Sequence, residues 1–455
     1  MASAELFEVV VGLVSLLLAA HLVGRLFARF RQPSVVGEIL GGLLLGPTVL
    51  GQLAPDAQRF LFPTGGAAAV GVSLVYQLGM LLLMFTAGVE MRTVFSRENR
   101  ATVAVVSVVG MLVPFGIGLL MVTAIDTTAL VGPANDVTGL TLMIACAIAV
   151  TSIPVISRIM LDLGIIRSRF ARMVLSVAVL EDIVLNVIIS ITLGMVAARG
   201  DEGFGLAVLL GIDATAARAV YHVVVSLAFF AATAMVAAWI RRGTGGRPPR
   251  SRPGEVAGRM TVLLSVVALC VFLGVAPIFG AFVVGLMSGR RGRPDDNEAL
   301  VSIRRFSSGF FIPIYFAVVG LKLDLVHALD PWFTAGFVLV ACVAKGASVY
   351  LGARMTHRST SESANLALAL NARGGPGIVL ATVAYDAGIV NESLFTTLIL
   401  TAVGTSQLAG WALEVAVRRG TLQADDNTRV PTGPGNVVDD SHVPAEHTPG
   451  NAVVG

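Results

Sequence analysis

The sequence predicts an all-α polytopic membrane protein with about 13 transmembrane helices. Of its 455 residues, 55% are hydrophobic and only 13% are charged, whereas about a quarter of a soluble domain is charged. Runs of about 20 apolar residues, the length that crosses a bilayer core as a helix, recur along the chain. These observations exclude a water-soluble enzyme and a disordered chain. The basic residues lie in short clusters between apolar runs, which indicates loops rather than a nucleic-acid-binding surface.

Apolar runs define the predicted spans, and polar stretches define the segments between them. Residues 1–420 are expected to form one transmembrane domain, and the polar residues 421–455 a disordered cytoplasmic tail. The predicted spans are 5–29, 32–50, 71–91, 101–124, 138–160, 169–198, 216–240, 257–273, 275–289, 306–323, 332–353, 363–386 and 392–417.

The distribution of basic residues predicts the orientation. If the N-terminus is outside, 25 of the 32 lysines and arginines fall in cytoplasmic loops or span ends and only four on the outer side, among them Lys322. Cytoplasmic loops carry such an excess of positive charge. The chain is therefore expected in the cell membrane with its N-terminus outside and its C-terminus in the cytoplasm. No cleavable signal peptide is expected, because Glu5 and Glu8 replace a basic leader.

The two halves of the chain resemble each other weakly and predict inverted repeats at about 32–198 and 275–417, with a linker at 199–274. The second span reads GEILGGLLLGP and the ninth reads GAFVVGLMSG, both with glycines spaced for close helix packing. The fifth and twelfth spans are both interrupted. Paired breaks in inverted halves are typical of a transporter binding site, whereas one break alone is an ordinary kink. The residues expected at the breaks are Pro154, Gly374, Gly375, Pro376 and Gly377.

Charged residues inside spans are the candidate site, because a charge in the membrane is costly and usually functional. Glu181 and Asp182 lie near the middle of the sixth span, and Lys345 lies in the eleventh. Asp182 and Asn186 share one helix face with Ser190 and present oxygen atoms, which suit a hard monovalent cation. A buried carboxylate that holds either a proton or Na+ or K+ supports exchange by competition alone. The expected metal ligand is Asp182.

Several roles remain alternatives at this stage. Glu181 is either an ion carrier or the structural partner of Lys345, since a paired buried charge is less costly than a lone one. Thr151 and Ser152 are expected to offer oxygens to a cation beside Asp182. Arg373 is expected to offset the negative ends of the half-helices. The three cysteines have no zinc or disulfide spacing, and no cofactor is expected.

Seven segments in order resemble the monovalent cation:proton antiporter-2 family. They cover nearly all of the chain up to about residue 418. The segments are QPSVVGEILGGLLLGPTVLG (32–51), LGMLLLMFTAGVEM (78–91), AVTSIPVISRIM (149–160), AVLED (178–182), GAFVVGLM (280–287), VAKG (343–346) and NARGGPGIVLA (371–381).

This resemblance implies a homodimer with a dimerisation domain and a core domain that slides like an elevator. It implies ion binding at Asp182, beside two crossed broken helices, and pairing of Lys345 with Glu181. Electrogenic sodium members carry Asp-Asp where this chain carries Glu-Asp, and potassium-efflux members often carry Gln-Asp. The resemblance therefore leaves the cation and the coupling ratio open.

Four functions are compatible with these features. The leading hypothesis is cation:proton antiport with Na+ or K+. The alternatives are a potassium efflux unit of the same superfamily, an organic-solute symporter on a similar fold, and a membrane sensor without transport. A channel would need a carbonyl-ring filter, and no TVGYG-like segment is present.

Overall fold

The computed structural model describes residues 3–30, 33–63, 65–91, 100–166, 168–197, 205–212, 215–243, 254–288 and 298–422. The regular secondary structure of these residues is helical, and their only strand-like pairing is an isolated bridge between Val131 and Val390. The helices are α1 (Ser3–Arg29), α2 (Ser34–Leu45), α3 (Leu50–Leu53), α4 (Pro55–Leu61), α5 (Gly66–Met91), α6 (Arg100–Ala124), α7 (Val137–Ala149), α8 (Ile153–Asp162), α9 (Arg169–Ala197), α10 (Leu206–Leu209), α11 (Thr215–Gly243), α12 (Glu255–Leu273), α13 (Pro277–Ser288), α14 (Glu298–Phe306), α15 (Ile312–Leu321), α16 (Pro331–Met355), α17 (Thr360–Ala369), α18 (Gly374–Asp386) and α19 (Glu392–Arg418).

Every predicted span contains at least one of these helices. Within the described residues, eight helices are long and apolar enough to cross a membrane, or up to nine if α17 and α18, bent by 41° at their break, are counted as one span. Helices α7 and α13 and residues 220–233 are shorter apolar segments. The chain is therefore a multi-pass helical membrane protein, while the count of 13 stays a prediction. Most of the predicted tail, residues 423–455, lies outside the described residues.

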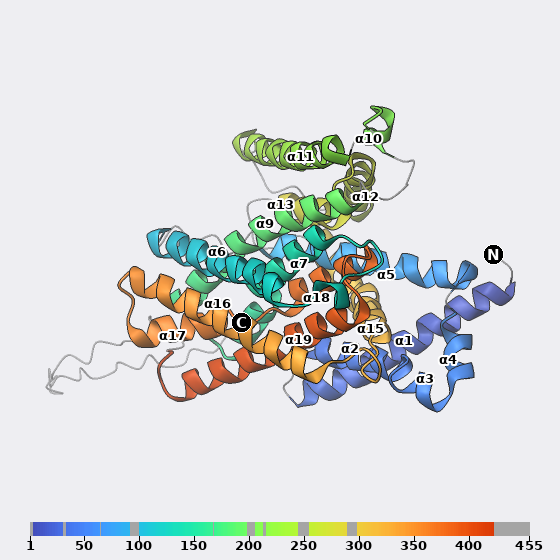
Figure 1. Ribbon diagram of the computed structural model, residues 1–455, viewed down its shortest axis with the longest axis horizontal. Helices are drawn as coiled ribbons and strands as arrows, with labels where there is room; N and C mark the ends of the chain where they lie inside the picture. The colour runs from blue at the N-terminus through green and yellow to red at the C-terminus, as the bar shows by residue number, and fades with distance from the viewer. Residues whose placement is uncertain are drawn as a thin grey trace, which may run out of the picture.

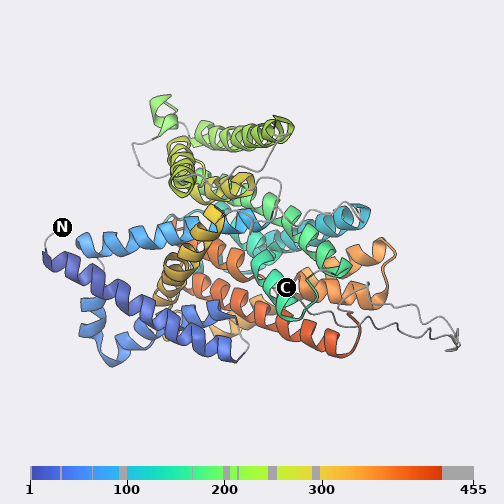
Figure 2. The same cartoon turned by 180° about the vertical axis from the view of Figure 1, so that it is seen from behind.

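The helices form two bundles. The first, here called the glycine bundle, contains α1, α2, α5, α12, α13 and α15; the second, the crossing bundle, contains α6 to α9 and α16 to α19. Helices α1 and α4 of the first bundle's side lie at one end of the long axis, and α6, α16 and α17 lie at the other (Figure 1); Figure 2 shows the same arrangement from behind. Among the described residues, α5 packs on α8 and α9 packs on α13 between the bundles.

Glycines hold the first bundle together in two equivalent contacts. A Cβ on Gly42 of α2 would overlap the carbonyl of Ala317 on α15, and a Cβ on Gly285 of α13 would overlap that of Phe85 on α5. Gly42 and Gly285 occupy the same place in the two glycine motifs noted in the sequence. The absence of side chains lets each helix pair approach at backbone distance, and the contact recurs in both halves of the chain.

Candidate functional site

Two interrupted helices meet in the middle of the crossing bundle. Helix α7 ends at Ala149 and α8 begins at Ile153, while α17 ends at Ala369 and α18 begins at Gly374. The intervening segments lie side by side, because the Ser152 N–H donates to the carbonyl oxygen of Ala372 over 2.7 Å. Four half-helix ends therefore converge, each with backbone groups that have no partner inside its own helix.

The interruptions lie closer to the N-terminus than the sequence predicts. Pro154, Gly374, Gly375, Pro376 and Gly377 do not form the unwound segments but belong to the first turns of α8 and α18. Proline is tolerated there because the first N–H groups of a helix lack intrahelical partners. Gly374 adopts a positive φ of 35°, and a Cβ on it would lie 2.7 Å from the Ser152 hydroxyl oxygen, so glycine permits the close crossing.

Arg373 binds the carbonyl end of α7. Its buried guanidinium donates to the carbonyl oxygens of Ala147 (3.1 Å), Ile148 (2.9 Å) and Ala341 (2.7 Å). It also donates to the side-chain oxygen of Asn371 over 3.0 Å. The C-terminal end of a helix carries partial negative charge, so the position of Arg373 is the one expected for a residue that offsets it.

Lys345 and Glu181 form a buried ion pair beside the same helix end. Lys345 Nζ lies 2.8 Å from Glu181 Oε2, and both side chains are completely buried. The ammonium also donates to the carbonyl oxygens of Ala149 (2.8 Å) and Gly110 (2.9 Å), so its three donors are used. The Thr151 hydroxyl donates to Glu181 Oε2 over 2.7 Å. The Thr151 hydroxyl therefore faces Glu181 in this structure, while a contact between Thr151 and a cation beside Asp182 stays a prediction.

Asp182 lies apart from this pair and lines a cavity. Within the described residues no cation forms a salt bridge with it, although its side chain is almost fully buried. The cavity takes its polar side chains from Asp182 and Asn186. The Asn186 amide donates to the backbone oxygen of Asp182 over 2.9 Å. Asp182 is thus a buried carboxylate without a salt-bridge partner among the described residues, and it borders the cavity.

The cavity lies between the two bundles, which sequence reasoning did not anticipate. Its apolar wall includes Met84 of α5 and Phe282 of α13 from the glycine bundle, opposite Asp182, Asn186 and Pro376 of the crossing bundle. No local signal marks Met84 or Phe282, since apolar side chains in a span usually face lipid or neighbouring helices.

The remaining predicted polar residues support the helix ends. The Ser152 hydroxyl caps α8 by accepting from Val155 N–H over 3.4 Å, and the Ser190 hydroxyl accepts from the Ala276 N–H over 3.2 Å. Ser190 thus bonds to the glycine bundle and does not line the cavity. Sequence reasoning also missed Ser406, whose hydroxyl accepts from the first N–H of α18 over 2.9 Å.

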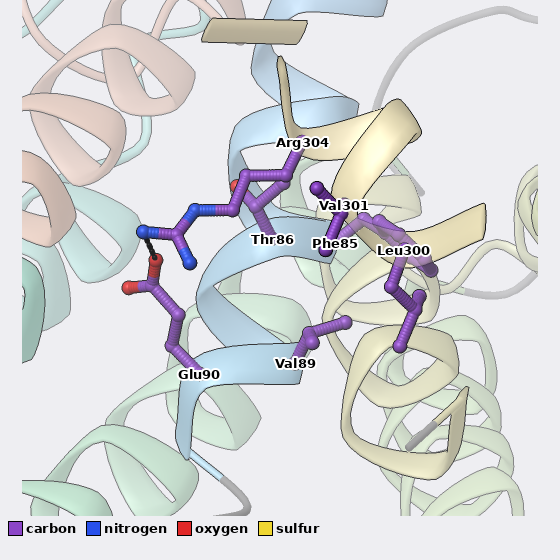
Figure 3. Close-up of a pocket in the computed structure, with 7 residues that line it drawn as sticks. All are labelled: Phe85, Thr86, Val89, Glu90, Leu300, Val301 and Arg304. Atoms are coloured by element: carbon purple, nitrogen blue, oxygen red, sulfur yellow. Dashed lines mark ion pairs between the residues drawn. The ribbon is translucent and has the colours of Figure 1, made fainter. Parts of the chain in front are cut away.

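A second hollow lies at the C-terminal end of α5. Phe85 and Val89 of α5 and Leu300 of α14 give it an apolar lining, and Glu90 lies 3.6 Å from Arg304 beside it (Figure 3). The predicted site residues are absent from this lining. Its lining comes from α5 and α14.

Comparison with known proteins places this architecture in a family. The model of the family described as "Sodium/hydrogen exchanger, transmembrane" matches residues 14–419. The chain is 28% identical over 391 residues to the Na(+)/H(+) antiporter NhaS4 of Synechocystis, covering 85% of this chain and 92% of that protein. It is 29% identical over 408 residues to K(+)/H(+) antiporter 1 of Saccharomyces cerevisiae, again covering 85% of this chain but only 44% of the yeast protein.

The fold also has a solved counterpart. The sodium proton antiporter MjNhaP1 of Methanocaldococcus jannaschii matches with a TM-score of 0.57 at 17% identity, over 91% of this chain and 99% of that one. At this identity the likeness concerns the fold alone.

Proposed function

The chain belongs to the sodium/hydrogen exchanger family, and on this premise we propose that it is a secondary transporter that exchanges Na+ or K+ for protons. Relatives that it matches over most of their length, from Synechocystis and Bacillus cereus, are named Na(+)/H(+) and Na(+)/H(+)-K(+) antiporters. The chain spans about half the length of the yeast and plant relatives that it matches. Family membership supports a transporter rather than an enzyme.

One observation carries the proposal: Asp182 is buried beside a cavity without a salt-bridge partner among the described residues, while the adjacent Glu181 is paired with Lys345. An unpaired charge at this depth is costly. The carboxylate of Asp182 is stabilised when it takes up either a proton or a metal cation. Because the carboxylate binds either the proton or the metal cation, the two ions compete for it. This competition couples the movement of the cation to the movement of protons.

The oxygen ligands around Asp182 suit an alkali cation. We assign the cation to the Asp182 carboxylate, the amide oxygen of Asn186 and the unwound backbone at Val150, all of which line the cavity. The described residues contain no group of three histidine, cysteine or acidic side chains that would hold a metal of another class. Thr151 and Ser152 shape this site by holding the two breaks together.

Exchange requires that the site open to one side at a time. The cavity lies between the two bundles, which supports an elevator-like movement of the crossing bundle against the glycine bundle. We further propose a homodimer in the cell membrane, with the N-terminus outside and the C-terminus in the cytoplasm. The apolar helices interact with the lipid bilayer.

The test is Asp182→Asn in inside-out membrane vesicles that contain a pH-sensitive dye. The variant keeps the size of the side chain but holds no charge, so Na+ or K+ is expected to leave an imposed pH gradient undisturbed. Asp126→Asn is the matched control, because Asp126 lies in an exposed turn away from the cavity. Dissipation of the gradient by the Asp182→Asn variant at the control rate would refute the site.

A potassium efflux unit is the second candidate, because the yeast relative is named a K(+)/H(+) antiporter. Purified protein in liposomes, titrated separately with Na+, K+ and Li+, identifies the cation. When the same titration is repeated with the membrane potential clamped by an ionophore, the change in rate shows whether each exchange cycle moves net charge across the membrane. Flux of K+ without proton movement would replace antiport by efflux.

A further inference from the structure

Asp386, at the end of α18, joins the two bundles through both oxygens of its carboxylate. One oxygen, Oδ1, lies 2.5 Å from Nζ of Lys322, which follows α15. The other, Oδ2, accepts a hydrogen bond from the hydroxyl of Tyr76 on α5 over 2.7 Å. Asp386 belongs to the crossing bundle, whereas both of its partners belong to the glycine bundle.

An aromatic layer lies beneath this ion pair. Lys322 Nζ lies 4.3 Å from the centre of the Tyr76 ring, which stacks on Tyr315 with 5.4 Å between ring centres. The Tyr315 hydroxyl lies 3.4 Å from the hydroxyl of Thr382 on α18. Lys322 and Asp386 are 28% and 35% exposed, while Tyr315 and Thr382 are fully buried. The cluster thus passes from the surface into the interface between the bundles and closes it.

This layer lies between the Asp182 cavity and one side of the protein. Thr382 and Asp386 share a face of α18, four residues apart. Val379, which lines the cavity, lies seven residues before Asp386, or about 10 Å along the helix. On α5, Tyr76 precedes the cavity residue Met84 by eight residues, or about 12 Å. In the proposed orientation, the closed side is the outer one.

We propose that Tyr76, Lys322 and Asp386 form an outer latch, which holds the interface closed to the outside and opens once in every exchange cycle. This inference depends on the alternating access proposed above. A partly exposed ion pair contributes little stability and breaks easily. The Glu181–Lys345 pair differs in both respects, since it is fully buried and lies inside one bundle. The latch joins the two bundles and is partly exposed, so it is suited to open and close. The Glu181–Lys345 pair is buried inside one bundle, so it is suited to stay formed.

Cross-linking tests whether the latch must open. Cysteines replace Lys322 and Asp386 in a protein whose three native cysteines have been removed, and a short thiol-specific cross-linker of the reducible type joins them. The cross-linked protein in liposomes is expected to lose at least about tenfold in exchange rate, and reduction is expected to restore it. Cysteines at Thr48 and Leu325 form the control pair, because these residues contact each other inside the glycine bundle. Full exchange by the cross-linked latch pair would overturn the proposal.

Accessibility gives a second measure that does not require transport. Thr382→Cys places a thiol beneath the latch, and a membrane-impermeant maleimide is applied from outside to right-side-out vesicles. Adding Lys322→Gln is expected to raise the labelling rate about fivefold, as expected for loss of a partly exposed ion pair. Exchanging the two charges, with Lys322→Asp and Asp386→Lys together, is expected to return the rate toward that of the intact latch. An unchanged rate in Lys322→Gln would overturn the latch.

The two tests separate the latch from the proposed function. If neither the reduced nor the cross-linked protein exchanges cations, the proposal of antiport is wrong. The rate of maleimide labelling at Thr382→Cys then still decides whether the latch closes the outer side. If the reduced protein exchanges cations and labelling is insensitive to Lys322, antiport stands and the latch is wrong.

Discussion

Lys345→Met is the most severe single change that the structure predicts within the crossing bundle. Methionine matches the length and volume of the lysine stem but removes the ammonium. The change leaves Glu181 buried with the Thr151 hydroxyl as its remaining partner, because Glu181 Oε1 has no hydrogen bond among the described residues. It also leaves the carbonyl oxygens of Gly110 and Ala149 without the donor they share.

The magnitude follows from burial. Removing one partner of a buried ion pair costs about 3–5 kcal/mol, because the other charge stays in a medium that solvates it poorly. The full loss applies while Glu181 remains ionised. The double variant Glu181→Gln with Lys345→Met removes both charges and is expected to recover most of the lost stability.

Thermal unfolding of the purified protein in detergent measures these differences. At pH 8 the single variant is expected to unfold at a clearly lower temperature than the parent protein, and the double variant close to it. A single variant as stable as the parent at pH 8, or a double variant less stable than the single one, would contradict the assignment of the pair as a structural unit.

Three further predictions concern other parts of the molecule. Arg373→Lys is expected to lower thermal stability by about 3 kcal/mol and to slow exchange, because an ammonium cannot replace a planar guanidinium that reaches several carbonyls at once; equal stability and flux would contradict this role. Gly42→Ala is expected to cost about 1–3 kcal/mol through overlap with α15, whereas Gly116→Ala, with open space around it, is expected to be neutral or stabilising in the same unfolding assay. Partial burial by itself would raise the pKa of Asp324, but hydrogen bonds from His327 and from the N–H groups of His327 and Val326 hold that pKa below its usual value. The turn after α15 is therefore expected to contribute its full stability above about pH 4 and to lose it as the pH falls through the lowered pKa, and Asp324→Ala should remove this pH dependence from the unfolding temperature.

The sequence by itself determined the helical segments and the residues of the buried cluster. In a bilayer the backbone must satisfy its hydrogen bonds within the helix, so a run of apolar residues is sufficient to locate a span, and all 13 predicted spans contain helices. Charges inside such runs are rare enough that Glu181, Asp182, Lys345 and Arg373 stand out without any knowledge of the fold. The pairing of Lys345 with Glu181 was also anticipated, as the family resemblance implied it.

Only the tertiary structure decided which of these groups touch. Thr151 donates to Glu181, the glycines of α18 are helical and not unwound, and the cavity at Asp182 is closed by α5 and α13. Each outcome depends on how segments from distant parts of the chain pack. Lys322 and Asp386 illustrate the point: each ends a helix beside a loop, and only the arrangement of the two bundles brings them together. Local hydrophobic patterns encode where a helix runs, whereas contacts between helices depend on the shapes of both surfaces, which no single segment contains.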